Sequence, residues 1–163
     1  MLGHKVWQTF QDRFDTFATV RELRDSFARL TTVDDSKVIT GVSAVNKSDV
    51  DRAFTIAQPD VVVNCIGIVK QDKSAKDPIA SIGVNSLFPH QVALRCRESG
   101  ARLIHLSTDC VFSGRKGNYS ETDPPDSQDL YGRSKLLGEV DDEGSLTIRT
   151  SMIGRELTGS HGL

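Results

Sequence analysis

Three side chains in the second half of the chain could together move a proton: Thr108, Tyr131 and Lys135. Tyr131 precedes Lys135 by four positions, a spacing that places both side chains on one face of a helix. The pKa of tyrosine is about 10, so its phenol exchanges protons poorly at neutral pH, but a fixed ammonium nearby lowers that pKa. Such a pair can relay a proton to or from a carbonyl or alcohol oxygen, and the Thr108 hydroxyl could hold the same oxygen.

The elements that must position these residues alternate between strands and helices. Apolar, strand-like segments are expected at 16–20, 37–40, 61–69, 102–107 and 145–150. Helical segments are expected at 2–14, 21–30, 49–57, 84–98 and 131–140, and a loop rich in Gly, Pro, Ser and Asp at 113–130. This alternation predicts an α/β fold with a parallel sheet.

Local patterns add detail to these elements. The first helix carries Val6, Phe10 and Phe14 at i, i+4 and i+8, which predicts one apolar face. Ser48 is expected to be the N-cap of the third helix. The nearly continuous apolar run at 61–69 predicts a strand that is buried on both faces.

A set of segments in a fixed order resembles the extended branch of the short-chain dehydrogenase/reductase superfamily. Within that branch the chain is most similar to dTDP-4-dehydrorhamnose reductases and related sugar-nucleotide reductases. The segments that carry this resemblance are "PDVVVNCIGIV", "GVNSLFPHQVALRC", "HLSTDCVFSG", "YGRSKLLGE" and "IRTSMIGRE".

The resemblance implies a Rossmann-type, doubly wound parallel sheet. Residues 1–150 would form the NAD(P)-binding domain, and residues 151–163 would begin a substrate-binding lobe. In the family a first strand and a glycine-rich turn come before the segment that opens this chain. We therefore expect a truncated chain that lacks the first strand and most of the substrate lobe, with unpaired edges on the strands that the first strand would join.

The resemblance also assigns catalytic roles to matching positions. Thr108 would polarise a carbonyl oxygen, Tyr131 would donate the proton, and Lys135 would lower the pKa of Tyr131 and orient the ribose. Asp109 would assist at the substrate carbonyl, and Asn85 would hold a water that links Lys135 to solvent. Two simpler interpretations stay open, because Asp109 could bond the backbone of its own turn and Asn85 could cap or bridge secondary structure.

The cofactor is expected to be NADP(H) rather than NAD(H), because Arg21 follows the strand at 16–20, where an arginine accommodates a 2′-phosphate. Alternatively, Arg21 lies on a solvated helix face. Gly67 would allow close approach of the nicotinamide ribose, or would be a small residue required by packing. Ser107 would face the cofactor or the packed interior. The full set of expected cofactor contacts is Met1, Leu2, Gly3, Arg21, Cys65, Ile66, Gly67, Ser107, Tyr131 and Lys135.

These assignments imply an NAD(P)H-dependent reductase of a 4-keto sugar nucleotide. Three alternatives remain. The protein could be an epimerase or dehydratase of the same superfamily that holds NAD tightly. It could be a non-catalytic regulatory subunit that binds a dinucleotide, or this chain could be an inactive fragment.

Composition sets further bounds. With 163 residues and a net charge of −2, nothing suggests a nucleic-acid partner. No apolar run approaches the roughly 20 residues that span a bilayer, so no membrane association is expected. The three cysteines are widely spaced and form no CxxC motif, which favours reduced thiols and a cytoplasmic location. One of them, Cys110, could be catalytic, although a free cysteine usually packs as a small apolar residue. The histidines show no metal-ligand spacing, so no metal site is expected. A homodimer stays open.

Overall fold

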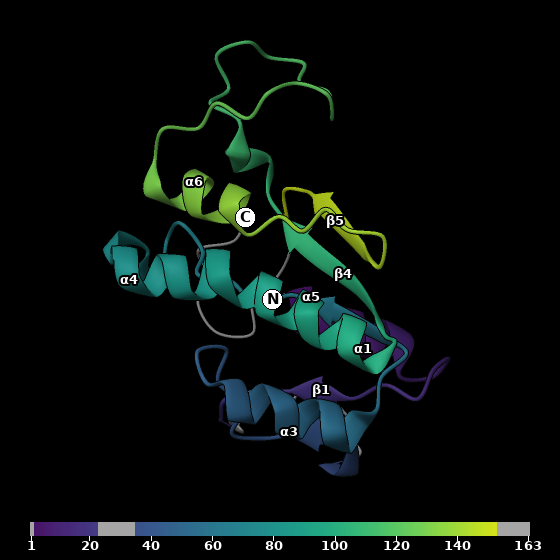
Figure 1. The fold of residues 1–163 in the computed structure, drawn as a ribbon. Coiled ribbons are helices and arrows are strands. Elements are labelled where there is room, and N and C mark those ends of the chain that lie inside the picture. Colours follow the sequence, from purple (N-terminus) through teal and green to yellow (C-terminus); the bar gives the residue numbers. More distant parts are fainter. Residues whose placement is uncertain (1, 23–34, 153–163) are drawn as a thin grey trace. The chain divides into compact units, whose positions relative to one another are not determined.

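The computed structural model describes residues 2–22 and 35–152. The described residues divide into two compact units, one formed by 2–22, 35–58 and 152 and the other by 59–151. Each unit contains parallel strands and helices, which confirms the predicted α/β class (Figure 1). The helix expected at 21–30 falls mostly outside the described residues, and so do Met1 and most of the expected lobe at 151–163.

The first unit contains a two-stranded parallel sheet. Ala18 pairs with Val38, and Thr19 pairs with Ile39. Its core is formed by Ile39, Val42 and Ala53, with Phe17 and Ala57 packed against them. The elements of this unit are α1 (Leu2–Phe10), β1 (Ala18–Thr19), the short 3-10 helix η1 (Asp35–Lys37), β2 (Val38–Ile39) and α3 (Lys47–Ala57).

Two local expectations for this unit are wrong. The buried residue of α1 is Trp7, whereas Phe10 is 38% and Phe14 64% exposed, because the helix ends at Phe10 and the apolar face predicted across 2–14 is interrupted. The N-cap of α3 is Asn46, not Ser48. The extended backbone of Asn46 lets its side-chain oxygen accept from the backbone N–H of Ser48 at 3.1 Å, so the helix begins at Lys47, two residues before the start that a Ser48 cap would give.

The second unit contains a three-stranded parallel sheet in the order β3-β4-β5. The register pairs Asn64 with His105 and Ser107 with Arg149. The strands are β3 (Val61–Asn64), β4 (Arg102–Ser107) and β5 (Ser145–Arg149). The helices are η2 (Lys73–Lys76), α4 (Pro78–Ser81), η3 (Ile82–Leu87), α5 (Phe88–Ser99), η4 (Asp109–Val111) and α6 (Leu130–Leu137).

The expectation that 61–69 forms a strand buried on both faces is wrong. The strand β3 ends at Asn64, and Val61 and Val63 are 50% and 37% exposed. Within the described residues β3 pairs only with β4, which leaves its other edge without a ladder. The central strand β4 is covered instead: Leu103 and His105 are buried, and α5 packs along it (Figure 1).

The helix expected at 84–98 is longer and is interrupted. It starts with α4, where Asp77 caps the first turn by accepting from the N–H of Ile79 at 2.9 Å. It continues through η3, which is a π-helical turn, into α5, and it ends at the left-handed Gly100. The π turn places Asn85 and Ser86 in the interior. π turns occur often at functional sites, so the interruption of the expected helix marks this segment as a candidate part of such a site.

The loop expected at 113–130 is confirmed, since no helix or strand occurs between η4 and α6. A helix long and apolar enough to cross a membrane is absent from the described ranges.

Candidate functional site

The predicted catalytic residues meet in the second unit, beside the ends of its first two strands. Thr108 directly follows β4, Gly67 lies in the loop after β3, and α6 carries Tyr131 and Lys135. Ligands bind at the carboxyl ends of strands in open parallel sheets. The site is therefore built where the fold class predicts a ligand.

Lys135 is buried under this edge, with only 5% of the residue exposed. Its ammonium donates to the backbone carbonyl of Leu106 at 2.8 Å. Burial lowers the pKa of Lys135 from 10.5 to about 8, and the negative charge of Glu139 opposes that change. A buried ammonium of this kind exerts its charge locally, because little water screens it.

Tyr131 is half-buried at the start of α6. Burial raises its pKa above the usual 10, and negative groups nearby, including Asp109 and Asp129, raise it further. A hydrogen bond with the Thr108 side chain acts in the opposite direction. The expectation that Lys135 lowers this pKa is thus not met, because burial dominates and the Lys135 ammonium is bound to the Leu106 carbonyl. The raised pKa keeps the phenol protonated at neutral pH but also makes it a weaker acid, so the described surroundings do not by themselves activate Tyr131 as a proton donor.

Thr108 is held in place by the turn that follows it. Its hydroxyl accepts from the backbone N–H of Cys110 at 3.1 Å and donates to the carboxylate of Asp109 at 3.3 Å. It is 6% exposed, whereas Asp109 is exposed. The carboxylate of Asp109 thus accepts from the side chain of Thr108, whereas the simpler interpretation named the backbone of its own turn.

Asn85 fastens the loop after β3 to α6. Its amide oxygen accepts from the N–H of Ile68 at 2.8 Å, and its amide nitrogen donates to the Ile68 carbonyl at 3.1 Å and to the Ser134 hydroxyl at 3.2 Å. The residue is fully buried. Its side chain thus bridges secondary structure, which is the second interpretation raised from the sequence.

Gly67 leaves a space that fits a ligand. It is exposed, and a Cβ added to it would lie 3.8 Å from Nζ of Lys135 and 3.4 Å from Oδ1 of Asn85. Cys65 and Ile66, before it, are half-buried, and the N–H of Ile66 donates to Asn64 at 3.0 Å. A ribose or a nicotinamide ring could therefore lie against this backbone close to Lys135, so the residues fit a dinucleotide.

Ser107 faces the packed interior rather than the open edge of the site. It is 1% exposed and donates to Glu139 at 2.6 Å. Glu139 also accepts two hydrogen bonds from Arg149, at 2.9 and 2.7 Å. Sequence reasoning missed this network, although the position of Glu139 four residues after Lys135 placed it on the same helical face.

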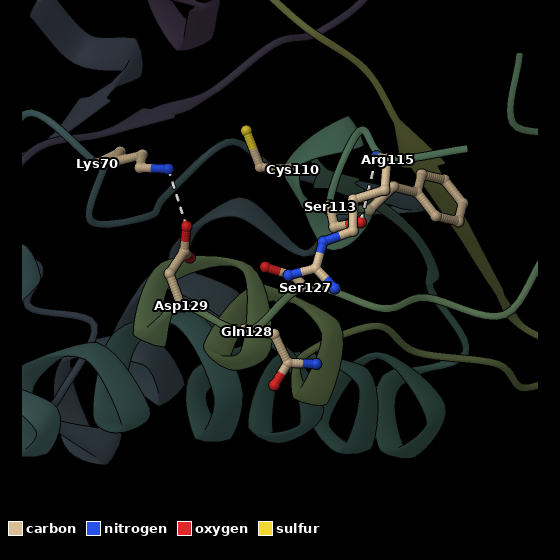
Figure 2. A pocket seen from close by; sticks show the side chains of 8 residues that line it. Lys70, Cys110, Ser113, Arg115, Ser127, Gln128 and Asp129 are labelled. Atoms are coloured by element: carbon tan, nitrogen blue, oxygen red, sulfur yellow. Dashed lines mark hydrogen bonds and ion pairs between the residues drawn. The ribbon is translucent and has the colours of Figure 1, made fainter. Parts of the chain in front are cut away.

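A pocket of about 310 Å³, lined mostly by polar side chains, lies between Lys70 and the loop that leads from Cys110 to Asp129 (Figure 2). Its lining includes Lys70, Cys110, Arg115 and Asp129. Lys70 and Asp129 form an ion pair at 2.8 Å, and Asp129 is also the N-cap of α6, accepting from Gly132 at 2.7 Å. These contacts, first the Gly132 N–H and then Lys70, lower the pKa of Asp129. Sequence reasoning missed the pocket, because it forms between the loops at 65–72 and 110–129.

The remaining predicted cofactor contacts do not belong to the second unit. Leu2, Gly3 and Arg21 belong to the first unit, and Met1 lies outside the described residues. Arg21 is exposed after β1. Their roles stay predictions. In the ranges that the structure describes, no group of three or more His, Cys, Asp or Glu residues could hold a metal ion.

Comparison with known proteins gives matches along most of the chain. The family model described as the RmlD substrate binding domain matches residues 2–156. Among curated proteins, the dTDP-4-dehydrorhamnose reductase of Mycobacterium tuberculosis is 40% identical over 89 residues, which cover 52% of this chain and 29% of the relative. The chain spans less than half the length of the curated relatives it matches.

Solved structures give the same picture. A hypothetical dTDP-4-dehydrorhamnose reductase from Sulfolobus tokodaii matches with a TM-score of 0.77 at 26% identity, covering 94% of this chain and 53% of that one. The dTDP-4-dehydrorhamnose reductase of Bacillus anthracis, solved in complex with NADP, matches with a TM-score of 0.65 at 23% identity. That match covers 80% of this chain and 50% of the other, and it shows the shared fold.

Proposed function

We propose, because the chain belongs to the family of the RmlD substrate binding domain, that it carries the reacting centre of an NAD(P)H-dependent reductase of 4-keto sugar nucleotides. The observation that carries this proposal is the meeting of Thr108, Tyr131 and Lys135 beside the carboxyl ends of β3 and β4. The identity with a dTDP-4-dehydrorhamnose reductase supports the substrate class.

The roles of the residues follow from their surroundings. The dinucleotide, when bound, supplies the hydride for the carbonyl carbon. Tyr131, whose phenol is protonated at neutral pH, gives its proton to the carbonyl oxygen. Thr108, fixed by its own turn, could exchange its hydrogen bond with Asp109 for one to the same oxygen. Lys135 places its positive charge beneath Gly67, where the ammonium could orient the ribose of the bound dinucleotide.

The dinucleotide is proposed to lie against the loop of Cys65, Ile66 and Gly67, whose backbone is open above Lys135. NADP(H) is favoured over NAD(H), because Arg21 follows β1 and could pair with a 2′-phosphate. A reductase that shares the fold was solved with NADP, which agrees with this preference.

The sugar nucleotide is proposed to enter through the polar pocket. Cys110 follows Asp109, and Asp129 lies two residues before Tyr131, so the pocket adjoins the proton donor. The guanidinium of Arg115 and the ammonium of Lys70 could attract the diphosphate, while Gln128 could bond sugar hydroxyls. The free thiols of Cys65, Cys96 and Cys110 support a reducing compartment such as the cytoplasm.

Turnover of NADPH by the purified protein tests the proposal. With dTDP-4-dehydrorhamnose as the carbonyl substrate, the absorbance of NADPH should fall, and the product should carry a hydroxyl at C4. NAD that co-purifies with the protein, together with epimerised sugar and no net oxidation of NADPH, would instead indicate the epimerase alternative. Binding of NADPH and of the sugar nucleotide without any conversion would contradict the reductase and favour a regulatory role.

A further inference from the structure

Lys135 and Glu139 form hydrogen bonds with successive residues at the end of β4. The ammonium of Lys135 donates to the carbonyl of Leu106, and the carboxylate of Glu139 accepts from the hydroxyl of Ser107. The next residue along the strand is Thr108. Lys135 in the last turn of α6 and Glu139 just after the helix are therefore hydrogen-bonded to the two residues that directly precede Thr108 in the chain.

Glu139 is well held for this task. Its side chain is 14% exposed, and Arg149 on β5 binds both of its oxygens. Charge-assisted bidentate pairs of this kind fix geometry more tightly than neutral hydrogen bonds. The Arg149 guanidinium lies 5.2 Å from the ring centroid of Phe112, which restrains it from the other side. Glu139 thus joins β4, β5 and the end of α6 at one point.

The turn that places Glu139 after α6 requires a glycine at position 138. A Cβ on Gly138 would overlap the backbone carbonyl of Asn85 in the π turn, so only glycine lets the end of α6 approach η3 this closely. Beyond the end of α6 at Leu137, the N–H of Glu139 donates to the carbonyl of Leu136 at 3.1 Å, which closes a turn. The position of the carboxylate is therefore set by packing on both sides.

We propose that Glu139 is a positioning residue of the reaction: it fixes Thr108 through Ser107 and balances the positive charge of Lys135. This inference rests on the proposed function. Glu139 neither binds the carbonyl nor donates the proton. It sets the position of Thr108, which binds the carbonyl, and the charge of Lys135.

The electrostatic surroundings of Lys135 agree with this role. Glu139 favours its charged form, whereas burial disfavours it. On β4, His105 is fully buried, its pKa lowered to about 4 by burial and then by the charge of Lys135, so at neutral pH it adds no charge. The loop after β3 contributes the backbone at Gly67, and η3 contributes the neutral amide of Asn85. Glu139 is thus the group that holds the ammonium of Lys135 charged near neutral pH.

The pH dependence of Lys135 reactivity tests this inference without any need for turnover. Acetic anhydride labels only the neutral amine, so mass spectrometry of the labelled protein reports the titration midpoint of Lys135, expected at about 8 in the wild type. Glu139→Gln keeps the volume and removes the charge, and should lower this midpoint by roughly one pH unit, at the low end of the effect of an adjacent charge. Glu143→Gln removes an exposed carboxylate in the next turn and should leave the midpoint unchanged.

Two further variants separate charge from position. Ser107→Ala breaks the link to Thr108 without touching the charge, so it should reduce kcat about tenfold and leave the Lys135 midpoint in place. Glu139→Asp keeps the charge but shortens the reach, and should behave like Ser107→Ala. If Glu139→Gln does not fold, Glu139→Asp and Ser107→Ala still test the positioning of Thr108 through kcat.

An unchanged Lys135 midpoint in a folded Glu139→Gln variant would overturn the inference. So would wild-type kcat in both Ser107→Ala and Glu139→Asp. If the wild-type protein reduces no carbonyl at all, the proposed function fails, but the labelling midpoints still decide whether Glu139 sets the charge of Lys135.

Discussion

Gly67 and Lys135 lie so close that a methyl group on Gly67 would be in van der Waals contact with the ammonium, at 3.8 Å. These residues come from the loop after β3 and from α6, and Asn85 bonds that same loop at Ile68. Because Gly67 has no side chain, a bound molecule can reach the backbone directly above the buried charge. This relationship leads to a test that needs no substrate.

Gly67→Ala should weaken NADPH binding about tenfold without lowering the unfolding temperature. The added Cβ meets Asn85 at 3.4 Å and Lys135 at 3.8 Å, distances that the folded chain tolerates, yet it fills the space proposed for the ribose. Fluorescence titration of NADPH and calorimetry measure the two effects. Gly144→Ala, whose Cβ would meet only Asp142 at 4.0 Å, is the control. Unchanged affinity in Gly67→Ala would mean that the dinucleotide does not approach this loop.

Tyr131→Phe should lower kcat by about two to four orders of magnitude, the usual contribution of a general acid. Cofactor affinity should change little, since only a hydroxyl is lost. Steady-state kinetics and a binding titration on the same preparation give both numbers. Tyr119→Phe is the matched control, because Tyr119 stacks on Phe112 in the loop before α6. Near-wild-type turnover in Tyr131→Phe would remove Tyr131 from the mechanism.

Arg21→Asp should reduce the preference for NADP over NAD by tenfold or more, which corresponds to about 1.4 kcal/mol. The substitution exchanges a group that pairs with a 2′-phosphate for one that repels it and accepts from a 2′-hydroxyl. Competitive titration with the two dinucleotides measures the ratio. Arg13→Asp changes the same charge at another exposed position of the first unit and should leave the ratio unaltered. An equal ratio in wild type and Arg21→Asp would place Arg21 on a merely solvated surface.

His105 should make the fold sensitive to acid. Its ring is fully buried, Nδ1 accepts from Asn64 at 3.1 Å, and burial lowers its pKa from 6.5 to about 4. The unfolded chain therefore binds the extra proton first. The stabilisation is complete above pH 6.5 and is lost as the pH falls toward 4, a change of roughly 3 kcal/mol.

Urea unfolding at several pH values between 4 and 7 measures this dependence. His105→Asn retains an acceptor for Asn64 but does not titrate, so its free energy of unfolding should fall less on acidification than that of the wild type. His90→Asn replaces an exposed histidine and should keep the wild-type dependence. A steep acid dependence that survives in His105→Asn would assign it to other groups.

The exposed valines of β3 should promote aggregation. Val63 is 37% exposed on a strand that, in the described parts of the chain, pairs along one edge only. Val63→Lys should reduce light scattering on storage, with little change in the unfolding temperature. Ile79→Lys removes a more exposed apolar residue, 84%, from a helix and should have a smaller effect. Equal scattering by both variants would show that the strand edge is not the cause.

Much of the fold could be predicted because its signals are local. The apolar runs at 102–107 and 145–150 became the adjacent strands β4 and β5, and the family resemblance of the segments around them is confirmed. Thr108 and Tyr131 could be placed together because strand ends and helix faces have fixed geometry. These inferences need only the order of the elements, which the sequence patterns contain.

The features that were missed depend on contacts between distant segments. The pKa of Tyr131 depends on what buries the phenol, and the direction of the Lys135 ammonium depends on the carbonyl of Leu106. In the sequence Glu139 resembles an ordinary surface acid. Only the structure shows that Ser107 and Arg149 bind its carboxylate. Periodicity along the chain carries no information on such contacts.

The π turn at Ile82–Leu87 sets a limit on insertions and deletions in this segment of the chain. It holds one residue more than a turn of regular α-helix. Removing that residue would let the helix run on unbroken, but it would rotate every later side chain of α5 by about 100°, swinging Val92 and Cys96 out of the interior. A descendant that loses one position here must therefore rebuild the packing of α5 and give up the amide of Asn85 together, so the length of this segment should be inherited with its chemistry.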